Sequence, residues 1–167
     1  FETIRIMSGK PINVENHIAR LVEGAKVLRI RIPSYYNAQF FQERIEELVS
    51  KSNITKGGKC RLSIDRATGG TYLPTSNEAN FYIEVESYGS NFFELNAKGL
   101  EVDIYSEIKL QKNFLSNFKT KSCLQYVMAA VAAKEKELDD VFLGNDKGTI
   151  LETSSSNVFV VSNGVLY

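Results

Sequence analysis

The spacing of apolar and polar residues predicts a chain of mixed α and β structure. Residues 1–7 alternate between apolar and polar positions, a glycine turn follows at Ser8-Gly9-Lys10, and residues 11–14 are again extended. This pattern predicts a β-hairpin at the start of the chain. Asn163-Gly164 is a strong signal for another hairpin near the end. Alternation or short apolar runs predict further strands at about residues 59–66, 79–87, 100–107, 141–143, 149–151 and 158–161.

Apolar residues recur at three- and four-residue intervals in three other segments, and there the pattern predicts helices. These helices are expected over about residues 15–28, 38–50 and 122–137. In the third helix, large apolar side chains share one side, and we expect that side to be buried. Its members are Leu124, Val127, Met128 and Val131.

The polar stretch at residues 88–91 is the best candidate for a boundary between two subdomains. We expect an N-terminal α/β domain over residues 1–88, a linker over 89–98, and the first part of a second domain over 99–167. The sequence opens and stops inside strand-like patterns, so we also expect further chain on both sides.

Composition and charge argue against several classes of function. Hydrophobic residues make up 43% and charged residues 24%, as in an average soluble globular protein. Twenty basic residues balance twenty acidic ones, and no apolar run approaches the roughly 20 residues that span a bilayer, so we expect no nucleic-acid or membrane partner. Cys60, Cys123 and a single histidine leave no set of ligands for a Cys/His zinc site. We expect both thiols to be reduced and the protein to be cytoplasmic.

Two windows carry candidate chemistry. Residues 109–121 contain four lysines and no acid, and Lys119 lies between an Asn-containing loop and the start of a helix. Residues 151–159 contain Glu152, four consecutive hydroxyl residues and Asn157, which suit an anionic group such as phosphate. Taken alone, the first window is also compatible with a solvated basic loop, and the second with a polar turn between strands.

Together with other segments, these windows resemble the class IV aminotransferase family, the fold type IV enzymes that use pyridoxal 5′-phosphate (PLP). The resemblance extends along the whole chain, and its specificity lies in the order and spacing of the segments. The segments are Phe1-Glu2-Thr3-Ile4-Arg5, Gly9-Lys10, His17-Ile18-Ala19-Arg20-Leu21, Lys119-Thr120, the helix with Leu124, Val127 and Ala129, Asp139-Asp140, residues 148–159, and residues 163–167. It implies a two-domain α+β fold whose C-terminal part is incomplete here, and a homodimer.

The resemblance also implies roles for individual residues. Lys119 stands where the family attaches PLP covalently, and Glu152 where an acid pairs with the pyridine nitrogen of the cofactor. Arg20 matches the arginine that binds the cofactor phosphate. Ser156 and Asn157 lie in the segment that approaches the cofactor. Lys121 is the rival of Lys119, whereas His17 is expected to be structural.

The loop that follows the predicted strand at 59–66 bears on which member of the family this is. Arg66-Ala-Thr-Gly-Gly-Thr-Tyr72 lacks the Arg-x-His pair of the D-amino-acid enzymes, and its Arg-x-x-Gly-Gly pattern is similar to aminodeoxychorismate lyase. That resemblance implies release of pyruvate from 4-amino-4-deoxychorismate to give 4-aminobenzoate for folate biosynthesis, with Lys119 as the base. The alternatives are a transaminase of branched-chain or D-amino-acid type and a relative that catalyses no reaction.

Overall fold

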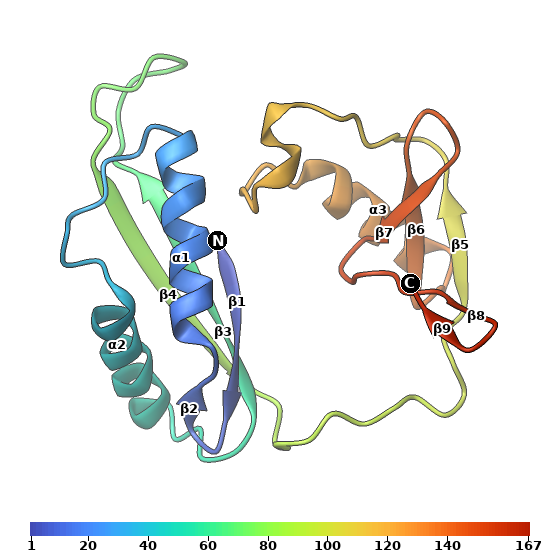
Figure 1. Cartoon of the computed structure of the whole chain (residues 1–167), viewed down its shortest axis with the longest axis horizontal. Coiled ribbons are helices and arrows are strands. Elements are labelled where there is room, and N and C mark those ends of the chain that lie inside the picture. The colour runs from blue at the N-terminus through green and yellow to red at the C-terminus, as the bar shows by residue number, and fades with distance from the viewer. The chain divides into compact units, whose positions relative to one another are not determined.

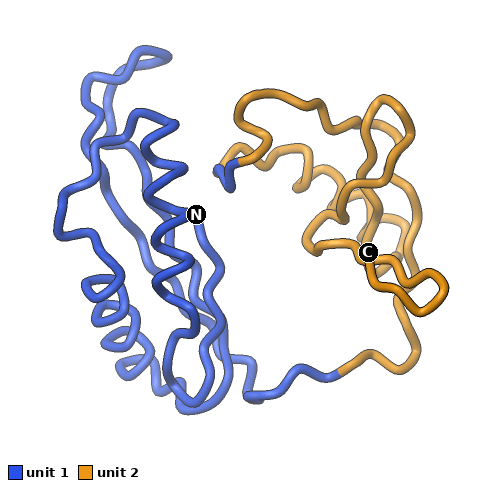
Figure 2. Tube along the Cα trace, viewed as in Figure 1, with its two compact units in different colours: residues 1–94, 118–120 blue, residues 95–117, 121–167 orange.

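The computed structural model describes all 167 residues, which divide into two compact units. The first unit contains residues 1–94 and 118–120, and the second contains residues 95–117 and 121–167 (Figure 2). Each unit has a hydrophobic core of its own. The chain first passes from one unit to the other within residues 89–98, the stretch that the sequence predicts as a linker.

The first unit is an antiparallel sheet with two helices packed against one of its faces. Its sheet has the strand order β2-β1-β3-β4 (Figure 1). The predicted hairpin, the first two predicted helices and the two predicted strands of this unit are confirmed, each to within a few residues. The elements are β1 (Glu2–Met7), β2 (Lys10–Pro11), α1 (Val14–Val27), α2 (Ala38–Lys51), β3 (Gly58–Arg66) and β4 (Ala79–Ser87).

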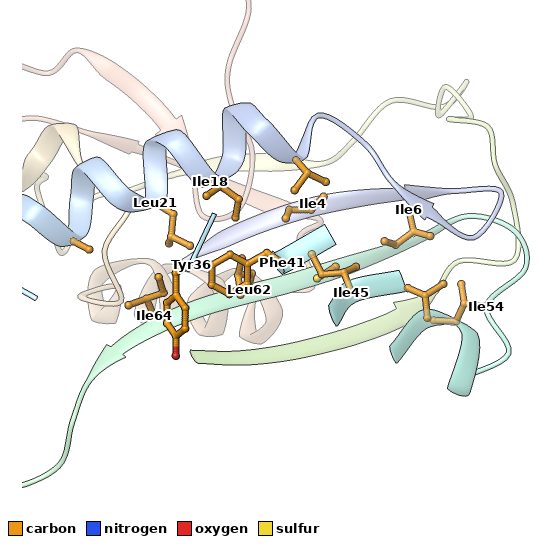
Figure 3. Packing of buried hydrophobic residues seen from close by; sticks show 14 of the residues in the cluster. Ile4, Ile6, Ile18, Leu21, Tyr36, Phe41, Ile45, Ile54, Leu62 and Ile64 are labelled. Atoms are coloured by element: carbon orange, nitrogen blue, oxygen red, sulfur yellow. The ribbon is translucent and has the colours of Figure 1, made fainter. Parts of the chain in front are cut away.

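The core of the first unit lies between the sheet and these two helices. Because side chains alternate along a strand, Glu2, Ile4 and Ile6 of β1 all point to the helix side, and all three are buried. Figure 3 shows Ile4 and Ile6 packed in one cluster with Leu62 of β3 and Phe41 of α2. Burial of each such side chain contributes roughly 1.5–3 kcal/mol. Because Ile4 and Ile6 are held in this core, the side chain of Glu2 on the same face of β1 is buried as well. Glu2 is the only buried charged residue of this unit.

The second unit contains a three-stranded sheet, one α-helix and a separate short hairpin. Strand β5 pairs in parallel with β6, which pairs antiparallel with β7, and α3 lies in the connection from β5 to β6 (Figure 1). Two parallel neighbours require such a crossover connection. The elements are β5 (Val102–Tyr105), the 3₁₀ helix η1 (Phe114–Asn117), α3 (Leu124–Glu135), β6 (Asp140–Gly144), β7 (Ile150–Thr153), β8 (Val161–Ser162) and β9 (Val165–Leu166).

The buried side of α3 differs from the side that the sequence predicts. Ala129 and Ala133 are the buried residues of this helix. The four residues expected there are 43–70% exposed: Leu124, Val127, Met128 and Val131. Alanines let the helix backbone lie close to β5 and β6, so the helix packs through its small side chains rather than through its large ones. The prediction of a helix is confirmed, but the prediction of its buried face is wrong.

The hairpin near the end of the chain forms at the predicted turn. Asn163 and Gly164 have φ values of 51° and 78°, the left-handed conformation that a tight two-residue hairpin requires. The preceding strand is shorter than the predicted 158–161, because the paired segment β8 begins only at Val161.

Both cysteines are free thiols, and burial raises the pKa of Cys60 to about 12. None of the helices has the length and apolar character needed to cross a lipid bilayer.

Candidate functional site: two charged clusters and a lysine loop

A buried carboxylate on β1 organises the first cluster. Arg20 and His17 lie three residues apart on α1 and so on the same side of that helix. Nε of Arg20 donates to Oε1 of Glu2 at 2.7 Å, and Nη2 of Arg20 donates to Oε2 of Glu2. Nδ1 of His17 lies 2.8 Å from the same Oε2. Strand β1 and helix α1 are thereby joined through one carboxylate.

The hydrogen bonds in this cluster favour the charged form of Glu2. Burial alone would raise the pKa of Glu2, but the hydrogen bonds from Arg20 and His17 outweigh burial and lower it. The hydrogen bond to Glu2 in turn raises the pKa of Arg20. The pair is therefore a carboxylate and a guanidinium at neutral pH.

One side of the Arg20 guanidinium remains open. The Glu2 side chain is 1% exposed, whereas the Arg20 side chain is 56% exposed. Because Nε and Nη2 are held by Glu2, Nη1 of Arg20 is left without a hydrogen bond. A planar guanidinium fixed in this way presents N–H donors that suit a phosphate. The geometry fits a phosphate ligand, and the role of Arg20 stays a prediction.

Lys119 lies in a loop just after η1 and is grouped with the first unit (Figure 2). Its backbone carbonyl accepts a hydrogen bond of 3.0 Å from the nitrogen of Phe1. Its Nζ lies 4.6 Å from the centre of the Phe1 ring, and the guanidinium carbon of Arg61 lies 4.1 Å from the same centre. The ammonium group has no hydrogen bond or ion pair, and the side chain is exposed. An amine without a carboxylate partner is available for covalent chemistry.

Glu152 lies on β7 in the second unit and is half-buried. Its Oε1 accepts a hydrogen bond of 2.7 Å from the hydroxyl of Tyr126 on α3. Burial, together with this hydrogen bond and the negative charge of Glu152, raises the pKa of Tyr126 to about 12. Tyr126 is therefore a protonated donor at neutral pH, and Oε2 of Glu152 has no hydrogen-bond partner.

Most of the hydroxyl groups that follow Glu152 donate hydrogen bonds to a carboxylate of the chain itself, that of Asp140. Asp140 at the start of β6 is buried and accepts hydrogen bonds from the hydroxyls of Thr153, Ser154 and Ser155, at 2.7, 2.6 and 3.3 Å. The backbone nitrogens of Val141 and Ser154 also donate to it. Burial alone would raise the pKa of Asp140, but these hydrogen bonds outweigh burial and lower it. The carboxylate thus shapes the turn at 153–156.

The two remaining residues of that segment are directed by the turn. The backbone nitrogen of Ser156 donates to Oγ1 of Thr153 at 2.9 Å, and the Ser156 carbonyl accepts from the Thr153 nitrogen at 3.0 Å. The side chains of Ser156 and Asn157 are exposed and make no hydrogen bonds. They are free to contact a ligand, and their role toward the cofactor stays a prediction.

Replacing Asp140 with asparagine is expected to loosen the turn at 153–156. Asparagine retains one acceptor oxygen but loses the charge, which should lower the free energy of unfolding by about 1–2 kcal/mol. The lowered pKa means that the carboxylate stabilises the fold above the pKa of an unfolded aspartate, about 3.9. This contribution is lost as pH falls through the folded pKa, so the difference between wild type and variant should close in acid.

Urea unfolding and amide hydrogen exchange of the full-length protein would measure this effect. The Asp146→Asn variant is a matched control, because Asp146 is exposed in the turn before β7. Equal exchange rates for residues 153–156 in the Asp140 variant and in wild type would contradict the assignment.

The guanidinium of Arg66, the first residue of the loop pattern at 66–72, makes its hydrogen bonds within the first unit. It donates to the backbone carbonyls of Leu28 and Arg29 at 2.6 and 3.3 Å, and to the side-chain oxygen of Asn77. These carbonyls lie just after α1, so the guanidinium ties that end of the helix to the loop after β3. The Arg66 side chain therefore stabilises the fold of the first unit, a role that the sequence pattern alone does not indicate.

The structure brings together residues that the sequence did not assign to the site. Glu2, Tyr126 and Asp140 each contact a predicted residue or shape the segment that carries one. For Glu2 a signal was present, because a charge in line with Ile4 and Ile6 on an alternating strand must be buried and paired. Arg20 and Lys119 belong to the first unit, whereas Glu152, Ser156 and Asn157 belong to the second.

The comparisons with known proteins establish the family. The family described as amino-transferase class IV matches residues 1–167, and the chain therefore belongs to it. The "probable branched-chain-amino-acid aminotransferase" of Rickettsia bellii is 28% identical over 170 residues, which cover 100% of this chain and 57% of that protein. The chain thus spans little more than half the length of the curated relatives that it matches.

Solved structures share this fold at low sequence identity. The branched-chain aminotransferase from Thermoproteus uzoniensis with norvaline has a TM-score of 0.83 at 23% identity, covering 99% of this chain and 56% of that one. A "putative 4-amino-4-deoxychorismate lyase" from Legionella pneumophila has a TM-score of 0.80 at 23% identity, covering 99% and 59%. An aminotransferase from Brucella abortus bound to PLP has a TM-score of 0.76 at 19% identity, covering 99% and 58%. The chain therefore has the class IV aminotransferase fold, as its sequence predicts.

Proposed function

We propose that the whole protein is a PLP-dependent enzyme that acts on the amino group of a small amino acid, with transamination as its reaction. The observation that carries this proposal is the Lys119 amine, which lacks any ionic partner in a chain that matches the family from end to end. The open edge of Arg20 and the unoccupied oxygen of Glu152 are donor and acceptor groups of the kind that PLP requires.

Each residue has a distinct task in this proposal. Arg20 would bind the phosphate group through its outward N–H donors. Glu152 would hold a proton on the pyridine nitrogen, and Ser156 and Asn157 would line the cofactor. Lys119 would carry the cofactor covalently and move the proton at the α-carbon of the substrate. PLP, when bound, supplies the sink for the electrons released at that carbon.

Transamination is preferred to the lyase reaction because of Arg66. The Arg-x-x-Gly-Gly pattern favoured aminodeoxychorismate lyase, but Arg66 is bonded to the carbonyls of Leu28 and Arg29. The hydrogen bonds of Arg66 within the first unit therefore give little support to a role for this residue in binding a lyase substrate. The curated relatives are named as branched-chain aminotransferases or proteins like them. The Legionella structure keeps the lyase as the second candidate.

Product analysis with the full-length protein distinguishes these reactions. The purified protein would be incubated with PLP, 2-oxoglutarate and either branched-chain L-amino acids or D-alanine, and separately with 4-amino-4-deoxychorismate. We expect glutamate and the matching 2-oxo acid from an amino-acid donor. Pyruvate and 4-aminobenzoate from the last substrate would select the lyase instead. A protein that yields neither product set, although it binds PLP, would be a non-catalytic relative and would overturn the proposal.

The family resemblance also implies a homodimer, and we propose that state for the full-length enzyme. Light scattering of the purified protein would measure its mass directly. A monomer that retains full activity would contradict this part of the proposal.

A further inference from the structure

Tyr126 is the one residue of the second unit that makes a hydrogen bond to the side chain of Glu152. The proposed function assigns no role to this tyrosine. Its hydroxyl donates a hydrogen bond of 2.7 Å to Oε1 of Glu152, although the two residues are 26 positions apart in the sequence. This length is that of a strong hydrogen bond to a carboxylate. One of the two carboxylate oxygens is therefore occupied from within the chain, and only Oε2 is available to a ligand.

Packing fixes both partners of this bond. Tyr126 precedes Ala129 by three residues and Ala133 by seven, so it lies on the buried side of α3. Its ring packs against the cluster that contains Leu143 of β6. Leu143 is directly opposite Glu152 in the pairing of β6 with β7, so their side chains lie on the same face of the sheet. The contact between Tyr126 and Glu152 thus follows from the way α3 lies on this sheet.

We infer that Tyr126 is a positioning residue, which holds Glu152 with one oxygen directed to the pyridine nitrogen of the cofactor. This inference rests on the proposed function, because it presupposes that Glu152 meets that nitrogen. The hydroxyl of Tyr126 holds Oε1 of Glu152, so the carboxylate cannot turn freely and Oε2 keeps one direction. An oxygen held in line with the pyridine nitrogen would pair with the proton on that nitrogen, and a protonated ring is the better electron acceptor.

A double-mutant cycle in the full-length protein tests the inference. The Tyr126→Phe variant removes only the hydroxyl and keeps the ring that packs against the core of the second unit. We expect affinity for PLP to fall about tenfold, from the loss of one hydrogen bond to a charged group. In the Glu152→Gln background, the same change should have a much smaller effect, because the charged acceptor is already absent.

A second readout reports the protonation of the cofactor itself. With PLP labelled with ¹⁵N at the pyridine nitrogen, the wild-type chemical shift should be that of a protonated pyridine. In Tyr126→Phe the shift should move toward the neutral value, and kcat should fall with KM nearly unchanged. A purely structural tyrosine would lower stability without moving this chemical shift.

The control is Tyr105→Phe, which removes another hydroxyl that contacts a glutamate of the same unit, here Glu107 at 3.4 Å. It should leave both readouts unchanged. If Glu152→Gln weakens PLP binding and shifts the ¹⁵N signal but Tyr126→Phe does neither, the inference is overturned and the proposed function stands. If Glu152→Gln also has no effect, the role of Glu152 fails, and the inference fails with it.

Discussion

Replacing Lys119 with alanine is expected to abolish covalent attachment of PLP and to lower the turnover of the full-length enzyme by at least about 10³-fold. This size combines the loss of the nucleophile with the loss of the group that moves the substrate proton. In wild type, the Lys119 ammonium has no hydrogen bond or ion pair and lies 4.6 Å from the centre of the Phe1 ring. Its removal should cost little stability, because no polar partner is left unsatisfied.

Borohydride reduction followed by peptide mass analysis measures this directly. The wild-type protein should carry one reduced PLP adduct, on Lys119, and the variant should carry none at a specific site. Lys121→Ala is the matched control, since it removes another exposed lysine only two positions away. An adduct on Lys121, or a wild-type protein that never forms one, would refute the assignment.

Much of the first unit could be predicted from the sequence because its signals are local. Alternation in β1, β3 and β4 and helical spacing in α1 and α2 each arise within one element, and the structure reproduces them to within a few residues. The same local logic failed for α3. Periodicity ranks side chains by hydrophobicity, whereas the packing of this helix is set by backbone approach, which favours Ala129 and Ala133 over larger neighbours.

The residues of the candidate site show the same contrast between local signals and contacts that form only on folding. Lys119, Glu152 and Arg20 could be proposed because they stand in short ordered motifs. Their partners could not, because the contacts of Tyr126 with Glu152 and of Arg66 with Leu28 join residues 26 and 38 positions apart. Such contacts leave no period in the sequence. They depend on which strands pair and on how a helix lies across them, and these are properties of the folded unit.

The hydroxyl-rich segment shows a different limit. Consecutive hydroxyl residues indicate an anion nearby, and the sequence suggested a phosphate. The structure supplies an anion from the chain itself, because three of the four hydroxyls donate to Asp140. Composition identifies the kind of partner, but not whether the partner is a ligand or a buried side chain.

Replacing Glu2 with glutamine is expected to destabilise the first unit and, since we propose that Arg20 binds the cofactor phosphate, to lower the affinity for that phosphate. Glutamine keeps the shape of the side chain, but its amide group sets N–H donors against the N–H donors of Arg20. Loss of hydrogen bonds to a buried charged group should lower the free energy of unfolding by about 2 kcal/mol. Without the carboxylate, the guanidinium of Arg20 would no longer be fixed in one plane, and phosphate affinity should fall about tenfold.

The pH dependence of this effect has a definite sign. The hydrogen bonds from Arg20 and His17 lower the pKa of Glu2 despite its burial. Its contribution to stability is therefore complete above the pKa of an unfolded glutamate, about 4.3, and is lost as pH falls through the folded pKa. Urea unfolding at neutral pH should separate the variant from wild type, and the separation should narrow as the solution is made more acid. Glu23→Gln is the control, since Glu23 is exposed on α1, the helix that carries Arg20 and His17.

The effect on the cofactor is separated from the effect on stability by comparing PLP with pyridoxal, which lacks the phosphate. If Glu2 acts through Arg20, the Glu2→Gln and Arg20→Lys variants should both lose affinity for PLP while their affinity for pyridoxal changes little. A variant that loses both ligands equally would show only that the first unit is damaged. In that case Glu2 would be a structural link between β1 and α1, and the open edge of Arg20 would have no part in binding the phosphate.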